Sequence, residues 1–129
     1  MNSSPNYWQK WRWHEWFSSS VQRLPMTTRC VAFELLGRMW MNHPQGQLTV
    51  NGTGPMSDAE MAQLLHMRDT KSFTKHLARL LQENVFFRDT DGTLCSAKLM
   101  YEAAIADQKR DAAAERWRKA RERDGGGRA

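Results

Sequence analysis

The sequence predicts a mainly helical protein with a small β-sheet, an α+β fold. Apolar residues recur at helical spacings of three and four in the stretches 24–46 and 70–84. Short β-branched or aromatic runs occur at 47–50, between Gly46 and the turn that follows, and at 85–96, where Gly92 lies between two such runs. The chain of 129 residues is long enough to bury a core without metal or disulfide staples, so one domain with flanking segments is expected.

Composition limits the class of protein. The two cysteines, Cys30 and Cys95, form no C-x-x-C motif, which favours reduced thiols in a cytoplasmic compartment. Neither a signal peptide nor a run of apolar residues long enough for a membrane span is present, so no membrane association is predicted. The net charge of +5 is compatible with a polyanionic partner. The stretch 57–100 is neutral overall, which tells against a strong nucleic-acid binder.

An aromatic segment opens the chain and is taken as residues 1–23. Four tryptophans crowd into "NYWQKWRWHEWF" beside Lys10 and Arg12: Trp8, Trp11, Trp13 and Trp16. One interpretation is an aromatic cover that packs on the domain. The other is an arm that stacks on exposed bases or docks on a partner protein. The following "SSSVQ" is predicted to be a linker.

Two stretches between residues 24 and 84 are predicted to contain the main helices. Thr27 or Thr28 is expected to cap the first helix, and Pro44 and Gly46 to end it. Its apolar face comprises Ala32, Leu35, Leu36, Met39 and Trp40. After a lone strand at 47–50 and the turn "NGTGP", the capping box of Ser57 and Glu60 predicts a short helix over 58–65.

A further helix follows a tight turn, with Asp69 or Thr70 as its cap. Its apolar face is formed by Phe73, Leu77, Leu80 and Leu81, whereas Lys71, Ser72, Thr74, Lys75 and Arg79 lie largely off that face. Two helices joined by so short a turn are typical of a helix-turn-helix.

A β-hairpin is predicted over 85–96, because Asp91 and Gly92 form a strong turn signal between two β-rich runs. The lone strand at 47–50 can pair with it and complete a three-stranded sheet. Helix, strand, helix, helix, strand, strand is the order of a winged helix-turn-helix, assigned to residues 24–100.

The segment 101–124 is predicted to be a charged helix, followed by a disordered tail at 125–129. A heptad-like seam runs through it, mostly alanine: Leu99, Ala103, Ala106, Arg110, Ala113, Trp117 and Ala120. Ion pairs four residues apart, Glu115 with Lys119 and Arg118 with Glu122, support a solvated helix. Three interpretations stay open: a solvated helix, a basic helix along phosphates, and self-association.

No enzymatic motif is present. The sequence lacks G-x-G-x-x-G, a phosphate loop, H-E-x-x-H and G-x-S-x-G. The four histidines are too scattered for a metal site. A non-enzymatic protein without cofactor or metal is therefore expected.

With these elements in place, the chain resembles a family of phage and prophage proteins. Their N-terminal domain of unknown function sits in replication modules and is related in layout to winged-helix replisome organisers and replication initiators. The resemblance spans roughly residues 11–127 and is carried by "WHEWF", "MTTRCVAFELLGRMW", "GQLTVNG" with "MSDAEMAQLL", and "LLQENVFFRDTDGTLCSAKLMYEAAIADQKR". It implies a role in DNA replication in the cytoplasm of a bacterial host cell, and a host or phage replication protein as a further partner.

The leading functional hypothesis is a DNA-binding protein that acts in replication initiation or its control, with duplex favoured over single-stranded DNA. The residues expected to contact DNA are Lys71, Ser72, Thr74, Lys75 and Arg79 in the groove, Arg88 and Thr90 on the wing, and Arg116, Arg118, Lys119 and Arg121 as diffuse charge. The alternative is a winged-helix module that docks or sequesters a host or phage protein. The oligomeric state is left open.

Overall fold

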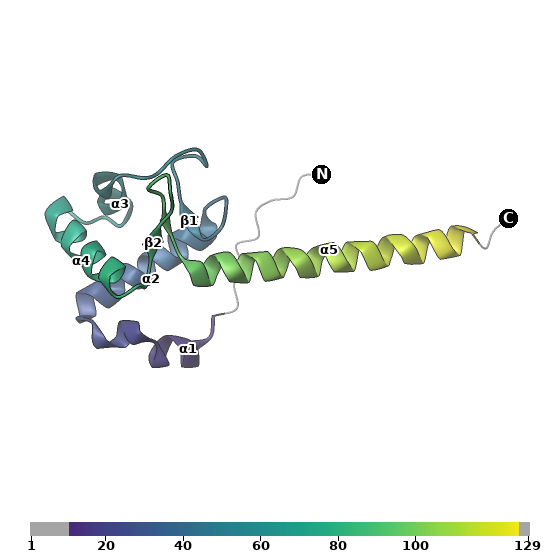
Figure 1. Cartoon of the computed structure of the whole chain (residues 1–129), viewed down its shortest axis with the longest axis horizontal. Coiled ribbons are helices and arrows are strands. Elements are labelled where there is room, and N and C mark those ends of the chain that lie inside the picture. The colour runs from purple at the N-terminus through teal and green to yellow at the C-terminus, as the bar shows by residue number, and fades with distance from the viewer. Residues whose placement is uncertain (1–10, 127–129) are drawn as a thin grey trace.

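The structure, a computed structural model, describes residues 11–126, with side chains described as far as Asp124. It is mainly helical with one three-stranded antiparallel sheet, which confirms the predicted α+β class. The elements are α1 (Trp13–Ser18), the 3-10 helix η1 (Ser20–Arg23), α2 (Met26–Met41), β1 (Gln47–Leu48), α3 (Asp58–Leu64), α4 (Thr70–Gln82), β2 (Phe87–Arg88), β3 (Leu94–Cys95) and α5 (Ala97–Gly126). Figure 1 shows α2, α3, α4 and the sheet gathered at one end of the molecule, with α5 extending away from them.

Helix α2 runs through the centre of this body and contacts η1, α4, β1 and α5. The five residues predicted for its apolar face are all buried, each 9% exposed or less. Opposite them lie side chains from every other part of the body, among them Leu48, Met61, Phe73, Leu77, Phe86, Leu94 and Leu99. The core is therefore built around α2.

The start of α2 differs from the prediction, since no threonine caps it. Pro25 occupies the N-cap position and provides no side-chain hydrogen bond. Thr28 lies inside the helix, fully buried, with its Oγ1 2.8 Å from Nδ1 of His76 on α4. The hydroxyl finds its partner across the α2–α4 interface because burial there leaves a polar group no access to water.

The predicted "SSSVQ" linker is also wrong. Ser20–Arg23 form a 3-10 turn, and Val21 is only 3% exposed within the core. Leu24, 6% exposed, follows it into the same cluster. The serine-rich composition suggested a linker, but the side chains of Val21 and Leu24 pack in the core and attach this segment to the body.

The sheet has the strand order β1-β3-β2, so the lone strand pairs with the hairpin as predicted. Gln47 and Phe87 both lie opposite Cys95 in the register. The strands are two residues long rather than four. One reason is that the N–H of Val85 donates to the carbonyl of Leu80 at 2.9 Å, so Val85 caps the C-terminal end of α4 and does not join the sheet.

The capping predictions for α3 and α4 are confirmed. The Ser57 hydroxyl accepts from the Glu60 N–H at 3.1 Å, and the Glu60 carboxylate accepts from the Ser57 N–H at 2.9 Å. Before α4, the Asp69 carboxylate accepts from the N–H of Lys71 at 3.0 Å. These contacts satisfy backbone donors that the first helical turn leaves unpaired.

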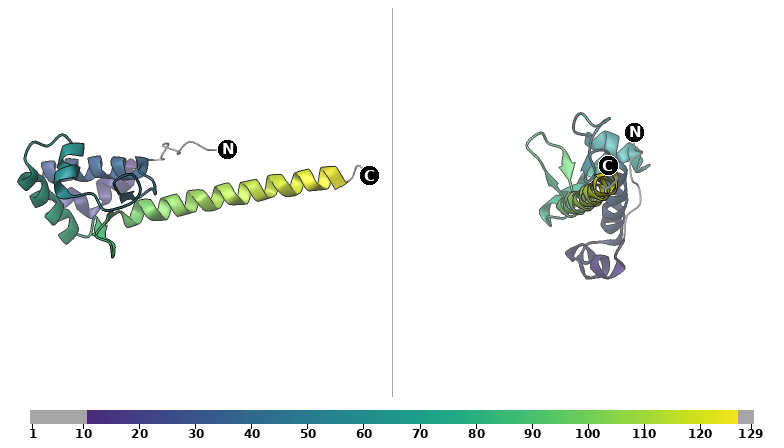
Figure 2. Two further views of the ribbon diagram at one scale, coloured as in Figure 1. Left: turned by 90° about the horizontal axis from the view of Figure 1, so that it is seen from above. Right: turned by 90° about the vertical axis from the view of Figure 1, so that its right-hand side faces the viewer.

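Helix α5 begins directly after β3 and continues for 30 residues. Leu99 and Ala103 are buried against the body, but from Asp107 to Asp124 no described side chain is buried. Figure 2 shows this part projecting beyond the other helices. At 1.5 Å per residue, the projecting part is about 30 Å long. Within residues 11–126, no helix has both the length and the apolarity needed to cross a membrane.

Candidate nucleic-acid interface

The exposed face of α4 carries a row of cations. Lys71, Lys75 and Arg79 are four residues apart and all exposed, so they lie on one side of the helix. Thr74 is also exposed, and Ser72 is half-buried. The structure therefore brings the five predicted groove residues onto the solvent side of one helix.

The opposite face of α4 holds the helix against the body. Phe73, Leu77 and Leu80 are 0–1% exposed and pack into the core shared with α2 and α3. The Thr28–His76 hydrogen bond adds a polar link to α2. Because this face is fully engaged, the basic face has a fixed orientation relative to the rest of the protein.

Within the part of the chain that the structure describes, no carboxylate forms an ion pair with Lys71, Lys75 or Arg79. The ion pair nearest to α4 among residues 11–124 joins Arg88 of the hairpin to Asp58 of α3. The three charges therefore remain available to an anion from outside the protein.

Asp58 lies between α4 and the hairpin. Its carboxylate accepts a hydrogen bond from the Thr74 hydroxyl at 2.7 Å and approaches the Arg88 guanidinium at 3.4 Å. Arg88 also donates to the carbonyl of Gly92 at 2.9 Å, within its own hairpin. Two of the predicted contact residues, Thr74 and Arg88, are thus held by internal bonds in this structure. The sequence did not predict that Asp58 contacts Thr74 or Arg88, since it indicated only that a short helix begins at residue 58.

The hairpin turn has its own hydrogen bonds. The Asp89 carboxylate accepts from the N–H groups of Asp91 and Thr93 at 2.9 and 3.0 Å. Thr90, predicted to lie near the DNA backbone, is exposed at the tip. The hydrogen bonds of the turn account for the Asp89 carboxylate here.

The predicted contacts on α5 are not brought together with α4. Arg116, Arg118, Lys119 and Arg121 lie on the projecting part of the helix, remote from α4 in both Figures 1 and 2. Arg118 pairs with Glu115 and with Glu122, the latter at 2.6 Å. The predicted pair between Glu115 and Lys119 is not formed, because Glu115 binds Arg118 instead.

The aromatic segment packs against α2. Trp8 lies outside the described residues. Trp11 and Trp16 are half-buried, pack against the core and contact Phe33 of α2, with ring centroids 5.1 and 5.4 Å away. Trp13 is 56% exposed and stacks between Phe17 and Phe33. Trp11 and Trp16 thus form part of a cover over the core, whereas the ring of Trp13 remains exposed to solvent.

An apolar groove lies beside these rings, between α1 and the start of α2. Its volume is about 410 Å³, and its lining includes Trp13, Phe17, Met26, Arg29, Phe33 and Glu34. Phe17 and Met26 are 65% and 66% exposed. Phe33 was not singled out in the sequence, although its position off the apolar face of α2 was readable as a sign of an exposed aromatic side chain.

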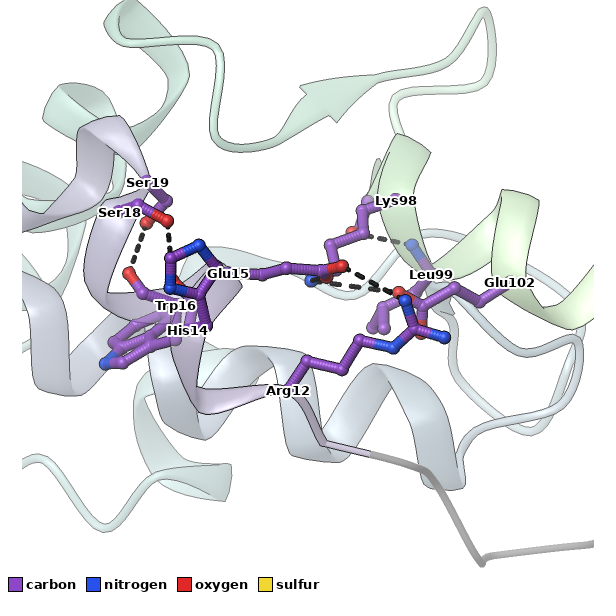
Figure 3. A network of polar contacts seen from close by, with 10 residues as sticks. Arg12, His14, Glu15, Trp16, Ser18, Ser19, Lys98, Leu99 and Glu102 are labelled. Carbon is purple, nitrogen blue, oxygen red and sulfur yellow. Dashed lines mark hydrogen bonds and ion pairs between the residues drawn. The ribbon is translucent and has the colours of Figure 1, made fainter.

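A polar network attaches α1 to α5. The Lys98 ammonium lies 3.0 Å from the Glu15 carboxylate and 5.8 Å from the centre of the Trp11 ring. Arg12 approaches the same carboxylate at 3.4 Å, and Figure 3 shows the cations converging on it. The hydrogen bond from Lys98 is the main cause that lowers the pKa of Glu15 below its ordinary value of 4.5.

Glu15→Gln should therefore reduce stability in a pH-dependent way. The Lys98 contact favours the ionised carboxylate, so its contribution is present at neutral pH and is lost as the pH falls below 4.5, through the lowered pKa. We expect the free energy of unfolding of the wild type to exceed that of the variant at pH 7 and to converge with it in acid. Urea unfolding of both proteins across this range measures the difference. A gap that persists unchanged in acid would show that Glu15 acts through packing.

Metal chemistry has no candidate site among the described residues, where no group of three or more His, Cys, Asp or Glu side chains could hold an ion. Both cysteines are free, Cys30 exposed and Cys95 buried. Burial, reinforced by the charge of Asp89, raises the pKa of the Cys95 thiol and keeps it protonated.

Comparisons with protein-family models, curated proteins and solved structures find no significant match to this chain.

Proposed function

We propose that this protein is a non-enzymatic DNA-binding protein of the winged helix-turn-helix type. In this proposal α3 and α4 form the helix-turn-helix, α4 enters the major groove, and the β2–β3 hairpin is the wing. A role in phage or prophage DNA replication rests on the sequence resemblance alone.

One observation carries the proposal: the free basic row of Lys71, Lys75 and Arg79. A helix in the major groove needs an exposed face, cations without internal partners and a rigid attachment, and α4 combines all three. Lysine and arginine bind phosphates, whereas Ser72 offers a hydroxyl that can contact either phosphate or base edges. Asp58 limits the contribution of the wing, because it already occupies part of the hydrogen-bonding capacity of Arg88.

The salt dependence of binding tests the proposal. If about five phosphates are neutralised, the logarithm of the binding constant should fall with the logarithm of salt concentration with a slope of about −4 to −5. Lys71→Ala/Lys75→Ala should weaken duplex binding and reduce the magnitude of that slope by about 2. Fluorescence anisotropy with a labelled duplex, and with a single strand of equal length, measures both quantities.

Arg23→Ala/Arg38→Ala is the matched control, because it removes two charges outside α3, α4 and the hairpin that form no ion pair among the described residues. It should leave the slope nearly unchanged. Duplex binding that is insensitive to salt, or equally affected by the two double variants, would contradict a role for α4 in the groove.

A second candidate function is docking of a partner protein, and the exposed aromatic groove favours it. Trp13, Phe17, Met26 and Phe33 are 40–66% exposed and lie together, which is unusual for large apolar side chains on a free surface. Absence of binding to both duplex and single strand would favour this candidate. Binding to the single strand alone, lost in Trp13→Ala, would instead indicate base stacking.

A further inference from the structure

The projecting part of α5 has two chemically distinct sides. On a helical wheel, one side from residue 105 to residue 123 contains four cations, four alanines and one isoleucine, and no acidic residue: Ile105, Ala106, Lys109, Ala112, Ala113, Arg116, Lys119, Ala120 and Arg123. We call it the acid-free face. Four of the five carboxylates between residues 105 and 124 lie on the other side of the helix, and the fifth, Asp124, follows the last residue of this face at the wheel position of Ala106.

Ion pairing sharpens this segregation. On the acidic side, Asp107 pairs with Arg110, and both Glu115 and Glu122 pair with Arg118. Within the described part of the chain, no ion pair involves Lys109, Arg116, Lys119 or Arg123, and all four are exposed. Two of the three arginines on the acidic side, Arg110 and Arg118, are therefore neutralised locally, while the acid-free face keeps its full charge.

The geometry of this face suits an extended anion. Lys109, Arg116 and Arg123 are seven residues apart, so they form a nearly straight row about 21 Å long. The alanines between them are small and allow a phosphate chain to approach the helix closely. A second copy of α5 that presented its own acid-free face would be repelled, because like charges would then face each other.

We propose that the acid-free face is a second phosphate-binding surface, which follows a nucleic-acid backbone outside the segment contacted by α4. This inference rests on the proposed function. It replaces Arg118 and Arg121 of the sequence prediction by Lys109 and Arg123, and it keeps Arg116 and Lys119.

An anionic membrane is the alternative polyanion, and the distribution of apolar residues disfavours it. Helices that lie in a bilayer interface insert bulky apolar side chains next to their basic residues. On this part of α5 the one bulky aromatic residue is Trp117, which is 68% exposed and lies at the edge of the acid-free face, beside Ala113 and Ala120. A single aromatic ring beside a row of alanines is much less apolar surface than such helices insert. The acid-free face presents mainly alanine to an apolar phase.

Two triple variants with equal loss of charge test the proposal. Arg116→Gln/Lys119→Gln/Arg123→Gln removes three cations from the acid-free face, and Arg110→Gln/Arg118→Gln/Arg121→Gln removes three from the other side. With the labelled duplex, the first should reduce the magnitude of the salt slope by about 2–3 and the second by less than about 1. The two sides are separable because an α-helix with side chains is about 10–12 Å wide and the Debye length near physiological salt is about 8 Å.

The outcomes separate this inference from the proposed function. Equal effects of the two triple variants would overturn it, since net charge alone would then act. An unchanged slope in the first variant, together with a reduced slope in Lys71→Ala/Lys75→Ala, would overturn it and leave α4 as the interface. A wild type that binds no duplex would remove both. Co-sedimentation with phosphatidylcholine–phosphatidylserine vesicles that is lost in Trp117→Ala would assign α5 to a membrane and overturn the inference as well. Circular dichroism confirms that each variant retains its helix.

Discussion

Phe73→Ala is expected to lower the free energy of unfolding by about 3–5 kcal/mol. The ring is fully buried on the side of α4 that faces the core, so truncation removes its apolar contacts and leaves a cavity beneath the basic row. A domain of this size is stable by only about 5–15 kcal/mol, so the loss takes a large share of the total. Urea unfolding followed by circular dichroism measures it.

Phe87→Ala is the matched control for this change. It removes the same ring from β2, where the side chain is 41% exposed, and should cost considerably less. If Phe73→Ala also weakens duplex binding at temperatures where the variant remains folded, the attachment of α4 contributes to recognition. Similar losses of stability in both variants would contradict the assignment of Phe73 to the centre of the core.

Gly46→Ala is expected to destabilise the fold by roughly 2–4 kcal/mol. Gly46 has a φ of +90°, which L side chains rarely adopt, and an added Cβ would lie 2.7 Å from Cγ and 2.8 Å from the backbone nitrogen of Met100. Its carbonyl accepts from the N–H of Ser96 at 2.8 Å, so the residue cannot shift without disturbing the junction between the sheet and α5. Thermal and urea unfolding give the size of the loss.

Gly37→Ala serves as the control and should have the opposite sign. This glycine lies inside α2, is exposed, and has no atom within 4 Å of an added Cβ. Alanine there should stabilise the helix by about 0.5–1 kcal/mol, because the unfolded chain loses conformational freedom. A destabilising Gly37→Ala would indicate a neighbour that the structure does not place there.

Local sequence signals predicted those parts of the fold that depend on local physics. The apolar face of α2, the capping box before α3 and the Asp69 cap each follow from residues within one or two helical turns. The pairing of β1 with the hairpin was also predicted, although it joins distant residues, because a hairpin and a lone strand leave few other partners. Which strand of the hairpin it joins was not predicted.

Other features required knowledge of distant contacts. Thr28 was one of two predicted caps of α2, but its hydroxyl shares a hydrogen bond with His76 on α4, 48 residues away in the sequence. Asp58 forms hydrogen bonds 16 and 30 residues along the chain, and no local pattern indicates them. The exposed basic row on α4 was predictable from helical spacing, whereas the internal bonds that hold Thr74 and Arg88 were not.

Between the last sheet residue, Cys95, and the first residue of α5, Ala97, the chain has only Ser96, whose backbone and hydroxyl are both engaged in hydrogen bonds. So short a connection behaves as a rigid coupling and leaves no room for a hinge. A molecule bound near the C-terminal end of α5 would consequently be held at a fixed distance and a fixed rotational angle relative to the body. One residue inserted after Met100 would rotate the projecting part of α5 by about 100° relative to the body. The insertion would change the orientation of its side chains and none of their identities.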